Sequence, residues 1–276
     1  MASTKRALYD SWKKLSTTLT GPKSVSNFQS TGTMTPKEFL EAGDALVQKL
    51  PVWEWAAGPV ENQPYLPPDK KYLVFRGAIC LERAPDSSAA NNETEAEDGW
   101  VSTYADHVPQ AKVEAAPQKE INWDDDDDDD AAEDVAEDLQ ERKCRLYDVF
   151  VTYDQFYQSP RVYFLGYSET NHSQFLTREQ MMEDVYATNR EKTVTVDPHP
   201  FLKAPCISIH PCRHAETMKR TLENLKDRLD SSQEDVPESE RVDFVFPTNL
   251  AMFIFLKFIS SVVPNIPIEP SDEFEM

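Results

Sequence analysis

The chain has 276 residues, 39% of them hydrophobic, and its 28 Lys and Arg residues are outnumbered by 49 Asp and Glu residues. This length is compatible with one large domain or two, the hydrophobic fraction supports a folded core, and a formal net charge of −21 argues against a nucleic-acid partner. No secretory signal, no apolar run of 18 residues and no cysteine framework is visible, so the composition predicts a reduced, cytoplasmic protein.

An amphipathic helix is predicted near the start of the chain. Its apolar residues share one face because they recur at helical spacing, and they are Leu8, Trp12, Leu15 and Leu19. Basic residues border this face, and Gly21 and Pro22 end the pattern. A basic helix with a narrow apolar stripe is typical of an arm that lies in a membrane interface. From these residues alone, a helix packed on the core or a disordered terminus is an equally good interpretation.

The next elements belong to a folded core. Residues 35–38 form a capping box, which predicts a helix that ends near Pro51. Trp53 and Trp55 follow in a loop bounded by Pro and Gly, and we expect both rings to be buried in the core. Residues 71–80 have the composition of a strand.

Residues 86–143 differ from the rest of the chain in composition. They contain 20 acidic and four basic residues, including seven consecutive aspartates, so they carry most of the net charge. Such a self-repelling sequence predicts a flexible acidic insert. An apolar island interrupts it, and islands of this kind often dock on a partner and become ordered on contact. The large apolar and aromatic residues of the island are Trp100, Val101 and Tyr104.

A β-hairpin is predicted after the insert. In the segments 145–154 and 161–167, every second residue falls on one face of the strand, and a short turn joins the two segments. The alternating face of the first strand consists of Tyr147, Val149, Val151 and Tyr153. A second capping box at residues 177–180 opens a short helix through Val185.

The remaining elements complete a meander of strands followed by helices. We predict strands at 192–196 and 206–209, a helix from 212 to about 229 and an apolar core helix around 250–258 that is too short to span a membrane. This order predicts an α+β fold, an antiparallel sheet covered by helices. The expected units are an arm at 1–22, a core at 23–85 and 144–276, the acidic insert at 86–143 and a second charged insert at 230–243.

Cys212 differs from the other cysteines because His210 and His214 flank it at a distance of two residues. Pro211 disfavours helix at His210, whereas apolar residues after Cys212 recur at helical spacing, so we expect an extended segment to turn into a helix beside the cysteine. The dipole at a helix N-terminus favours a thiolate, and Arg213 adds positive charge. The pattern therefore predicts a reactive cysteine.

Two other interpretations fit Cys212. A lone cysteine in a globular protein is most often a small buried hydrophobe. His210, Cys212 and His214 could also face one side of a strand and bind zinc, but a fourth ligand is missing and the other cysteines supply no second pair. We therefore expect neither a metal nor another cofactor.

The segment from His210 to Glu216, with the sequence HPCRHAE, resembles the catalytic segment of the E2-like autophagy conjugating enzymes, which transfer a small ubiquitin-like modifier to phosphatidylethanolamine. The resemblance covers nearly the whole chain outside the two inserts. Further matching segments are Gly43-Asp44, 51–55 (PVWEW), 99–104 (GWVSTY), 147–154 (YDVFVTYD), 192–195 (KTVT) and 255–258 (FLKF).

The resemblance implies an E2-like version of the α+β fold and a thioester mechanism. In this family an E1-like enzyme passes the modifier to the cysteine, so Cys212 would hold a thioester until the amine of the lipid attacks it. A threonine of the KTVT-like segment is thought to lie near the thioester, which points to Thr193. His210 and His214 match the histidines of the motif and would orient the loop.

The resemblance also implies the partners. The arm would bind a membrane that contains phosphatidylethanolamine. The acidic insert corresponds to the flexible region of the family that recruits the E1-like enzyme. The expected partners are thus the modifier, the E1-like enzyme and the membrane, and the expected location is cytoplasmic and peripheral at autophagic membranes. A non-catalytic adaptor of the same fold and a lipid-binding protein whose active part is the arm remain as alternatives.

Overall fold

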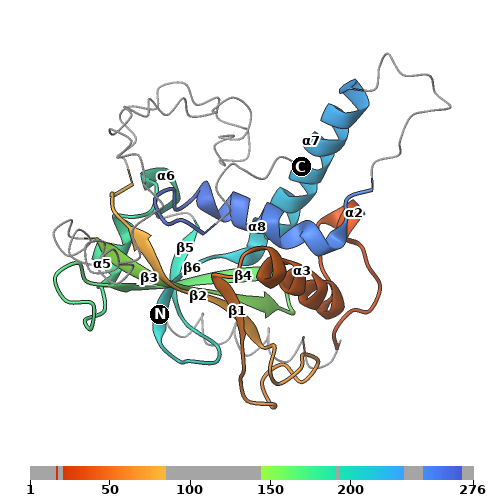
Figure 1. Ribbon diagram of the computed structural model, residues 1–276. Coiled ribbons are helices and arrows are strands. Elements are labelled where there is room, and N and C mark those ends of the chain that lie inside the picture. Colours follow the sequence, from red (N-terminus) through yellow and green to blue (C-terminus); the bar gives the residue numbers. More distant parts are fainter. Residues whose placement is uncertain (1–16, 18–20, 85–143, 191–192, 233–244, 269–276) are drawn as a thin grey trace, which may run out of the picture.

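The computed structural model describes residues 17, 21–84, 144–190, 193–232 and 245–268, and Figure 1 shows their arrangement. The predicted acidic insert, nearly all of the arm and most of the second insert lie outside these residues. The same is true of seven predicted site residues, which are Leu8, Trp12, Leu15, Leu19, Trp100, Val101 and Tyr104.

Six antiparallel strands form one sheet in the order β1-β2-β3-β4-β6-β5. The strands are β1 (Trp53–Ala56), β2 (Tyr72–Cys80), β3 (Arg145–Asp154), β4 (Ser159–Tyr167), β5 (Val194–Pro198) and β6 (Pro205–Ile209). The helices are α2 (Phe28–Thr31), α3 (Pro36–Lys49), α5 (Arg178–Met182), α6 (Ala187–Arg190), α7 (His214–Ser232) and α8 (Ala251–Ser260), with 3-10 turns η1 (Pro211–Arg213) and η3 (Thr248–Leu250). The predicted α+β class is confirmed.

Helices α3, α7 and α8 cover one face of the sheet, and α7 then runs outward from the body (Figure 1). The predicted alternation on β3 is confirmed, because all four residues named for it are buried in this core. Both predicted capping boxes are present. In the first, the Thr35 hydroxyl accepts from the Glu38 amide at 3.2 Å and the Glu38 carboxylate accepts from the Thr35 amide at 2.7 Å.

The prediction of a loop around Trp53 and Trp55 was wrong, because these residues form the edge strand β1, paired with β2. Pro51 and Gly58 bound a strand of only four residues, and its pairing depends on β2, which the local pattern does not reveal. Trp53 is buried as expected, whereas Trp55 is half-buried and packs over α3. A side chain at Gly43 would collide with the Trp55 ring, so the glycine permits this packing.

Part of the opposite face of the sheet is also buried, which the alternation did not predict. A second apolar cluster lies there, made of Tyr72, Val74, Phe150, Tyr163, Leu165 and Cys206. The loop between β5 and β6 covers it, with the Phe201 ring stacked on Tyr72 at 5.2 Å between centroids. His199 of the same loop is fully buried among these rings. A sheet with two apolar faces needs cover on both sides, and here the second cover is a loop.

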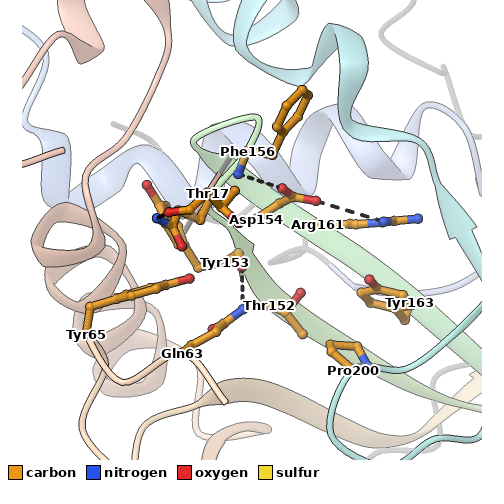
Figure 2. A pocket seen from close by; sticks show the side chains of 11 residues that line it. Thr17, Gln63, Tyr65, Thr152, Tyr153, Asp154, Phe156, Arg161, Tyr163 and Pro200 are labelled. Atoms are coloured by element: carbon orange, nitrogen blue, oxygen red, sulfur yellow. Dashed lines mark hydrogen bonds and ion pairs between the residues drawn. The ribbon is translucent and has the colours of Figure 1, made fainter. Parts of the chain in front are cut away.

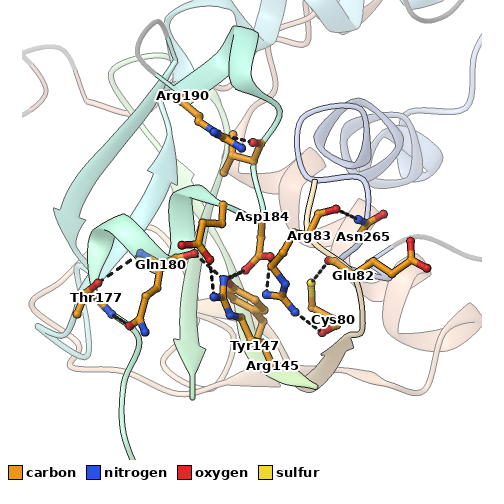
Figure 3. A network of polar contacts seen from close by, with 12 residues as sticks. Cys80, Glu82, Arg83, Arg145, Tyr147, Thr177, Gln180, Asp184, Arg190 and Asn265 are labelled. Atoms are coloured by element: carbon orange, nitrogen blue, oxygen red, sulfur yellow. Dashed lines mark hydrogen bonds and ion pairs between the residues drawn. The ribbon is translucent and has the colours of Figure 1, made fainter. Parts of the chain in front are cut away.

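A buried polar cluster joins the two chain ends that flank residues 85–143 (Figure 3). Asp184 is fully buried and accepts from Arg83 at 2.6 Å and from Arg145 at 2.9 Å. The Tyr147 hydroxyl donates to the same carboxylate at 2.5 Å. Because Arg83 precedes the segment and Arg145 follows it, one carboxylate fixes both of its ends to the sheet.

Candidate functional site

The turn that carries Cys212 connects the end of β6 to the start of α7. His210 has extended backbone angles, with φ −69° and ψ 127°, and Pro211 begins the 3-10 turn that leads into the helix. This confirms the predicted change from an extended segment to a helix beside Cys212. Cys212 lies in the middle of the three-residue turn and is exposed.

The other three cysteines are buried and differ from Cys212 in accessibility. Burial raises the pKa of Cys80 and of Cys206 to about 12, which keeps both as neutral thiols at physiological pH. Cys212 is therefore the one cysteine of the chain whose sulfur can meet another protein. This exposure speaks against a structural role for Cys212.

His210 caps the turn from the strand side. Its Nδ1 accepts from the backbone N–H of Cys212 at 3.3 Å, and its ring packs edge-on against Tyr157 at 5.5 Å between centroids. Because Nδ1 accepts, the proton of the neutral ring lies on Nε2. His210 thus orients the backbone of Cys212, and Tyr157 of the β3–β4 turn supports its ring.

His214 is fully buried beneath the turn. Its Nδ1 lies 2.9 Å from the carbonyl oxygen of Pro160, and the rings of Phe255 and Phe258 pack against it. Burial lowers the pKa of His214 to about 4, so the ring is neutral and Nδ1–H donates to Pro160. The structure places this histidine where it fixes the first turn of α7 to β4 and has no access to a substrate.

Thr193 lies beside the turn because β5 and β6 pair in register, with Val194 opposite Ile209. Its carbonyl oxygen accepts from the His210 amide at 2.8 Å, and its hydroxyl donates to the Asn189 carbonyl at 3.0 Å. The resemblance pointed to Thr193 as a polar group near the thioester, and the structure places its backbone against His210, two residues before Cys212. To donate to a developing oxyanion, the hydroxyl would have to rotate away from Asn189.

The geometry does not form the alternative zinc site. Cys212 points to solvent while His214 is enclosed in the core, so these residues do not converge. Within the described parts of the chain, no group of three His, Cys, Asp or Glu residues is arranged to hold a metal ion. No helix in those parts is both long enough and apolar enough to cross a membrane.

An open pocket of about 350 Å³ lies at the end of the β3–β4 hairpin that faces this site (Figure 2). Its lining includes Asp154, Phe156 and Arg161, and the Phe156 ring contacts Tyr157, which in turn contacts His210. Sequence reasoning missed Arg161, although it directly follows the Ser-Pro dipeptide after the hairpin turn. The side chains of the hairpin thus connect the pocket to the cysteine turn.

The fold and the site together define an E2-like conjugating enzyme, with an antiparallel sheet, covering helices and an exposed cysteine in the turn before a helix. The chain belongs to the family described as autophagocytosis-associated protein, active-site domain, whose model matches residues 38–269. This places it among the conjugating enzymes of autophagy.

Curated relatives agree with this assignment over nearly their full length. The chain is 32% identical to Autophagy-related protein 3 of Arabidopsis thaliana, covering 98% of this chain and 96% of the relative. It is 31% identical to Autophagy-related protein 3 of Meyerozyma guilliermondii, over 87% and 90% of the two chains. The protein of the same name from Schizosaccharomyces pombe is 28% identical, over 91% and 93%.

Proposed function

We propose that Cys212 accepts a ubiquitin-like modifier from an E1-like enzyme as a thioester and passes it to the amine of phosphatidylethanolamine. The observation that carries this proposal is the exposure of Cys212 in a turn that its neighbours hold in place, while every other cysteine of the chain is buried. Family membership supports the reaction class, and the exposure of Cys212 supports this residue as the nucleophile.

The chemistry consists of two acyl transfers at one sulfur. In the first, the Cys212 thiolate attacks the thioester carbonyl of the charged E1-like enzyme, and the thiolate of that enzyme leaves. In the second, the neutral amine of the lipid attacks the carbonyl on Cys212, an amide forms, the nitrogen loses a proton to solvent and the Cys212 thiolate leaves. The lipid ammonium must lose one proton before it can attack.

Each neighbour of Cys212 has a distinct proposed role. Thr193 would donate its hydroxyl to the oxyanion that develops on the thioester carbonyl. His210 would hold the backbone of Cys212 through the acceptor bond to its N–H. His214 would act as a positioning residue, since it contacts Pro160 and the aromatic core instead of the reacting atoms.

The proposed partners engage three other parts of the chain. Leu8, Trp12, Leu15 and Leu19 would bind the membrane from the arm at 1–22, and Trp100, Val101 and Tyr104 would bind the E1-like enzyme from the insert at 86–143. The core at 23–85 and 144–276, with its insert at 230–243, would carry the catalysis. Thr17, the one described residue among the first 20, contacts the β3–β4 turn, where the Gln155 side chain donates to its carbonyl at 3.0 Å. The protein would then work as a peripheral protein at autophagic membranes.

The replacement Cys212→Ser tests the assignment of the nucleophile. With E1-like enzyme, modifier and ATP, we expect the unmodified protein to form a thioester adduct that an added thiol cleaves and Cys212→Ser to form an oxyester that resists the thiol. Cys144→Ala removes a buried cysteine and is the matched control, for which a thiol-sensitive adduct is expected. A thiol-sensitive adduct on Cys212→Ser, or none on the unmodified protein, would refute the proposal.

A further inference from the structure

The strand that leads to Cys212 is weakly paired to the rest of the sheet. β3 and β4 are paired over nine residue pairs, and β5 and β6 over five. β4 and β6 are paired only through Tyr163 with Ser208 and Phe164 with Ile207. The β5–β6 hairpin, which carries Thr193 at its start and Cys212 just beyond its end, is therefore joined to the other four strands by two residue pairs.

The side chain of Arg161 bridges β4 to both strands of this hairpin. Its Nε donates to the Ser208 hydroxyl on β6 at 2.9 Å, and its Nη2 donates to the Asp197 carboxylate on β5 at 2.5 Å. The side chains of Arg161 and Asp197 are only 13% and 16% exposed, so solvent screens this pair less than a surface ion pair. Thr195 also donates to the Asp197 carboxylate, at 2.6 Å.

The two flanks of the cysteine turn are thus fixed to adjacent residues of β4. After the turn, His214 donates to the carbonyl of Pro160. Before it, Ser208 is held by Arg161, the next residue along β4. Because η1 has only three residues, a shift of β6 relative to β4 cannot be absorbed in the turn without moving Cys212.

Figure 2 shows the Arg161 side chain at the pocket beside Asp154. The Asp154 carboxylate lies 3.9 Å from Nη1 of Arg161. Arg161 also packs over the Tyr163 ring, 5.0 Å from its centroid. Carboxylates on both sides and an aromatic ring against its face restrict the guanidinium to one orientation.

We propose that Arg161 is a positioning residue for the transfer step, fixing the β5–β6 hairpin against β4 so that Cys212 and Thr193 keep their orientation toward the incoming amine. The proposal rests on the function proposed above for Cys212. Loading, the formation of the thioester on Cys212, needs from this chain an accessible sulfur, because the charged E1-like enzyme presents the carbonyl. Transfer requires this chain to align the thioester carbonyl with the amine and the Thr193 hydroxyl, and small misplacements in such an arrangement slow a reaction strongly. Transfer should therefore depend on Arg161 more than loading does.

The test compares Arg161→Met and Asp197→Asn with the unmodified protein in single-turnover assays of loading and of transfer to phosphatidylethanolamine vesicles. We expect loading within about two-fold of normal, a maximal transfer rate reduced about ten-fold and an unchanged half-saturating lipid concentration. The double variant should be no slower than the slower single variant, because both changes break the same link. Arg161→Lys keeps the charge but not the two-point geometry, so partial recovery is expected.

Hydrogen exchange provides a readout that does not depend on activity. Amides of β5 and β6 should exchange faster in Arg161→Met, while those of β2 and β3 keep their protection. Arg76→Met is the matched control, because Arg76 pairs with Glu54 on the exposed side of β1 and β2, away from the hairpin. We expect this variant to load and transfer normally.

The outcomes separate the two proposals. If the unmodified protein forms no thioester on Cys212, the proposed function fails, and the role of Arg161 fails with it. If it loads normally and Arg161→Met transfers at the normal rate, only the positioning role fails. Independent, additive losses in Arg161→Met and Asp197→Asn would also overturn it. If Arg161→Met does not fold, the loading and transfer rates of Arg161→Lys and Asp197→Asn are compared with those of the unmodified protein instead.

Discussion

His210 and His214 lie at equal spacing from Cys212 but in opposite environments. The chain is extended before the cysteine and helical after it, so the first ring remains near the surface while the second enters the core. The two histidines therefore have different structural roles despite their equal spacing from the cysteine. One ring accepts from the backbone of Cys212, and the other joins α7 to β4.

Replacing His214 by Leu tests its structural task. Leu retains apolar contact with Phe255 and Phe258 but leaves the Pro160 carbonyl without its donor. An unpaired buried carbonyl costs about 1–3 kcal/mol, so we expect the free energy of unfolding at pH 7 to fall by about 1 kcal/mol after the gain in packing is counted. Urea denaturation followed by tryptophan fluorescence measures the change. Unaltered stability at pH 7 would show that the bond to Pro160 contributes nothing.

The residues that sequence analysis identified depend on near neighbours in the chain. Pro211 beside Cys212 and the capping box at Thr35 act within one helical turn, so their patterns could be read directly. Arg161 acts on partners 36 and 47 residues away, and no local pattern predicts such contacts. Its role could be seen only once the strand order was known.

At the scale of elements, the start of α7 is fixed by a close approach of α2. Gly32 ends α2 with a φ of +68°, and a side chain there would collide with the backbone of α7 at Ala215. Ala215 is only three residues beyond Cys212. The short helix α2 therefore sets the position of the first turn of α7, a relation that the sequence did not suggest.

Gly32→Ala and Gly77→Ala separate this collision from backbone strain. Both glycines have positive φ, +68° and +70°, so Ala at either position costs about 1–2 kcal/mol through its backbone alone. A side chain at Gly77 meets no atom within 4 Å, whereas one at Gly32 meets α7. We expect Gly32→Ala to lose about 2 kcal/mol more unfolding free energy than Gly77→Ala, as in other overpacked sites, and to transfer the modifier more slowly. Equal losses in denaturation experiments would contradict the close packing of α2 on α7.

At the scale of the whole molecule, the sheet is buried on the face that the helices cover and on the part of the other face that the β5–β6 loop covers. The alternating residues of β3 correctly predicted the helix-covered face. They did not predict the second face, because Phe150 and Tyr163 there are covered by a loop distant in sequence. This loop encloses His199, so each face of the sheet contains one fully buried histidine.

The two buried histidines make stability depend on pH in a defined window. Burial lowers the pKa of both His199 and His214 to about 4, whereas an unfolded chain has a histidine pKa of about 6.5. Between these values the unfolded chain binds protons that the folded chain excludes. The stability from neutral burial is therefore complete above pH 6.5 and is lost as the pH falls toward 4, at up to about 1.4 kcal/mol per pH unit for each histidine.

Comparing His214→Leu with the unmodified protein isolates the contribution of His214 to the pH dependence of stability. The carboxylates that titrate at low pH are the same in both proteins, so their effect cancels in the comparison. The variant is expected to be about 1 kcal/mol less stable at pH 7. Its unfolded chain, however, has no histidine at position 214 whose protonation would stabilise the unfolded state as the pH falls. We therefore expect the unfolding free energies of the two proteins to converge as the pH falls and to cross between about pH 6 and pH 5. Urea denaturation at half-unit steps from pH 7.5 to 4.5 measures both curves. Parallel curves across this range would show that His214 accepts its proton equally well in the folded and unfolded chains.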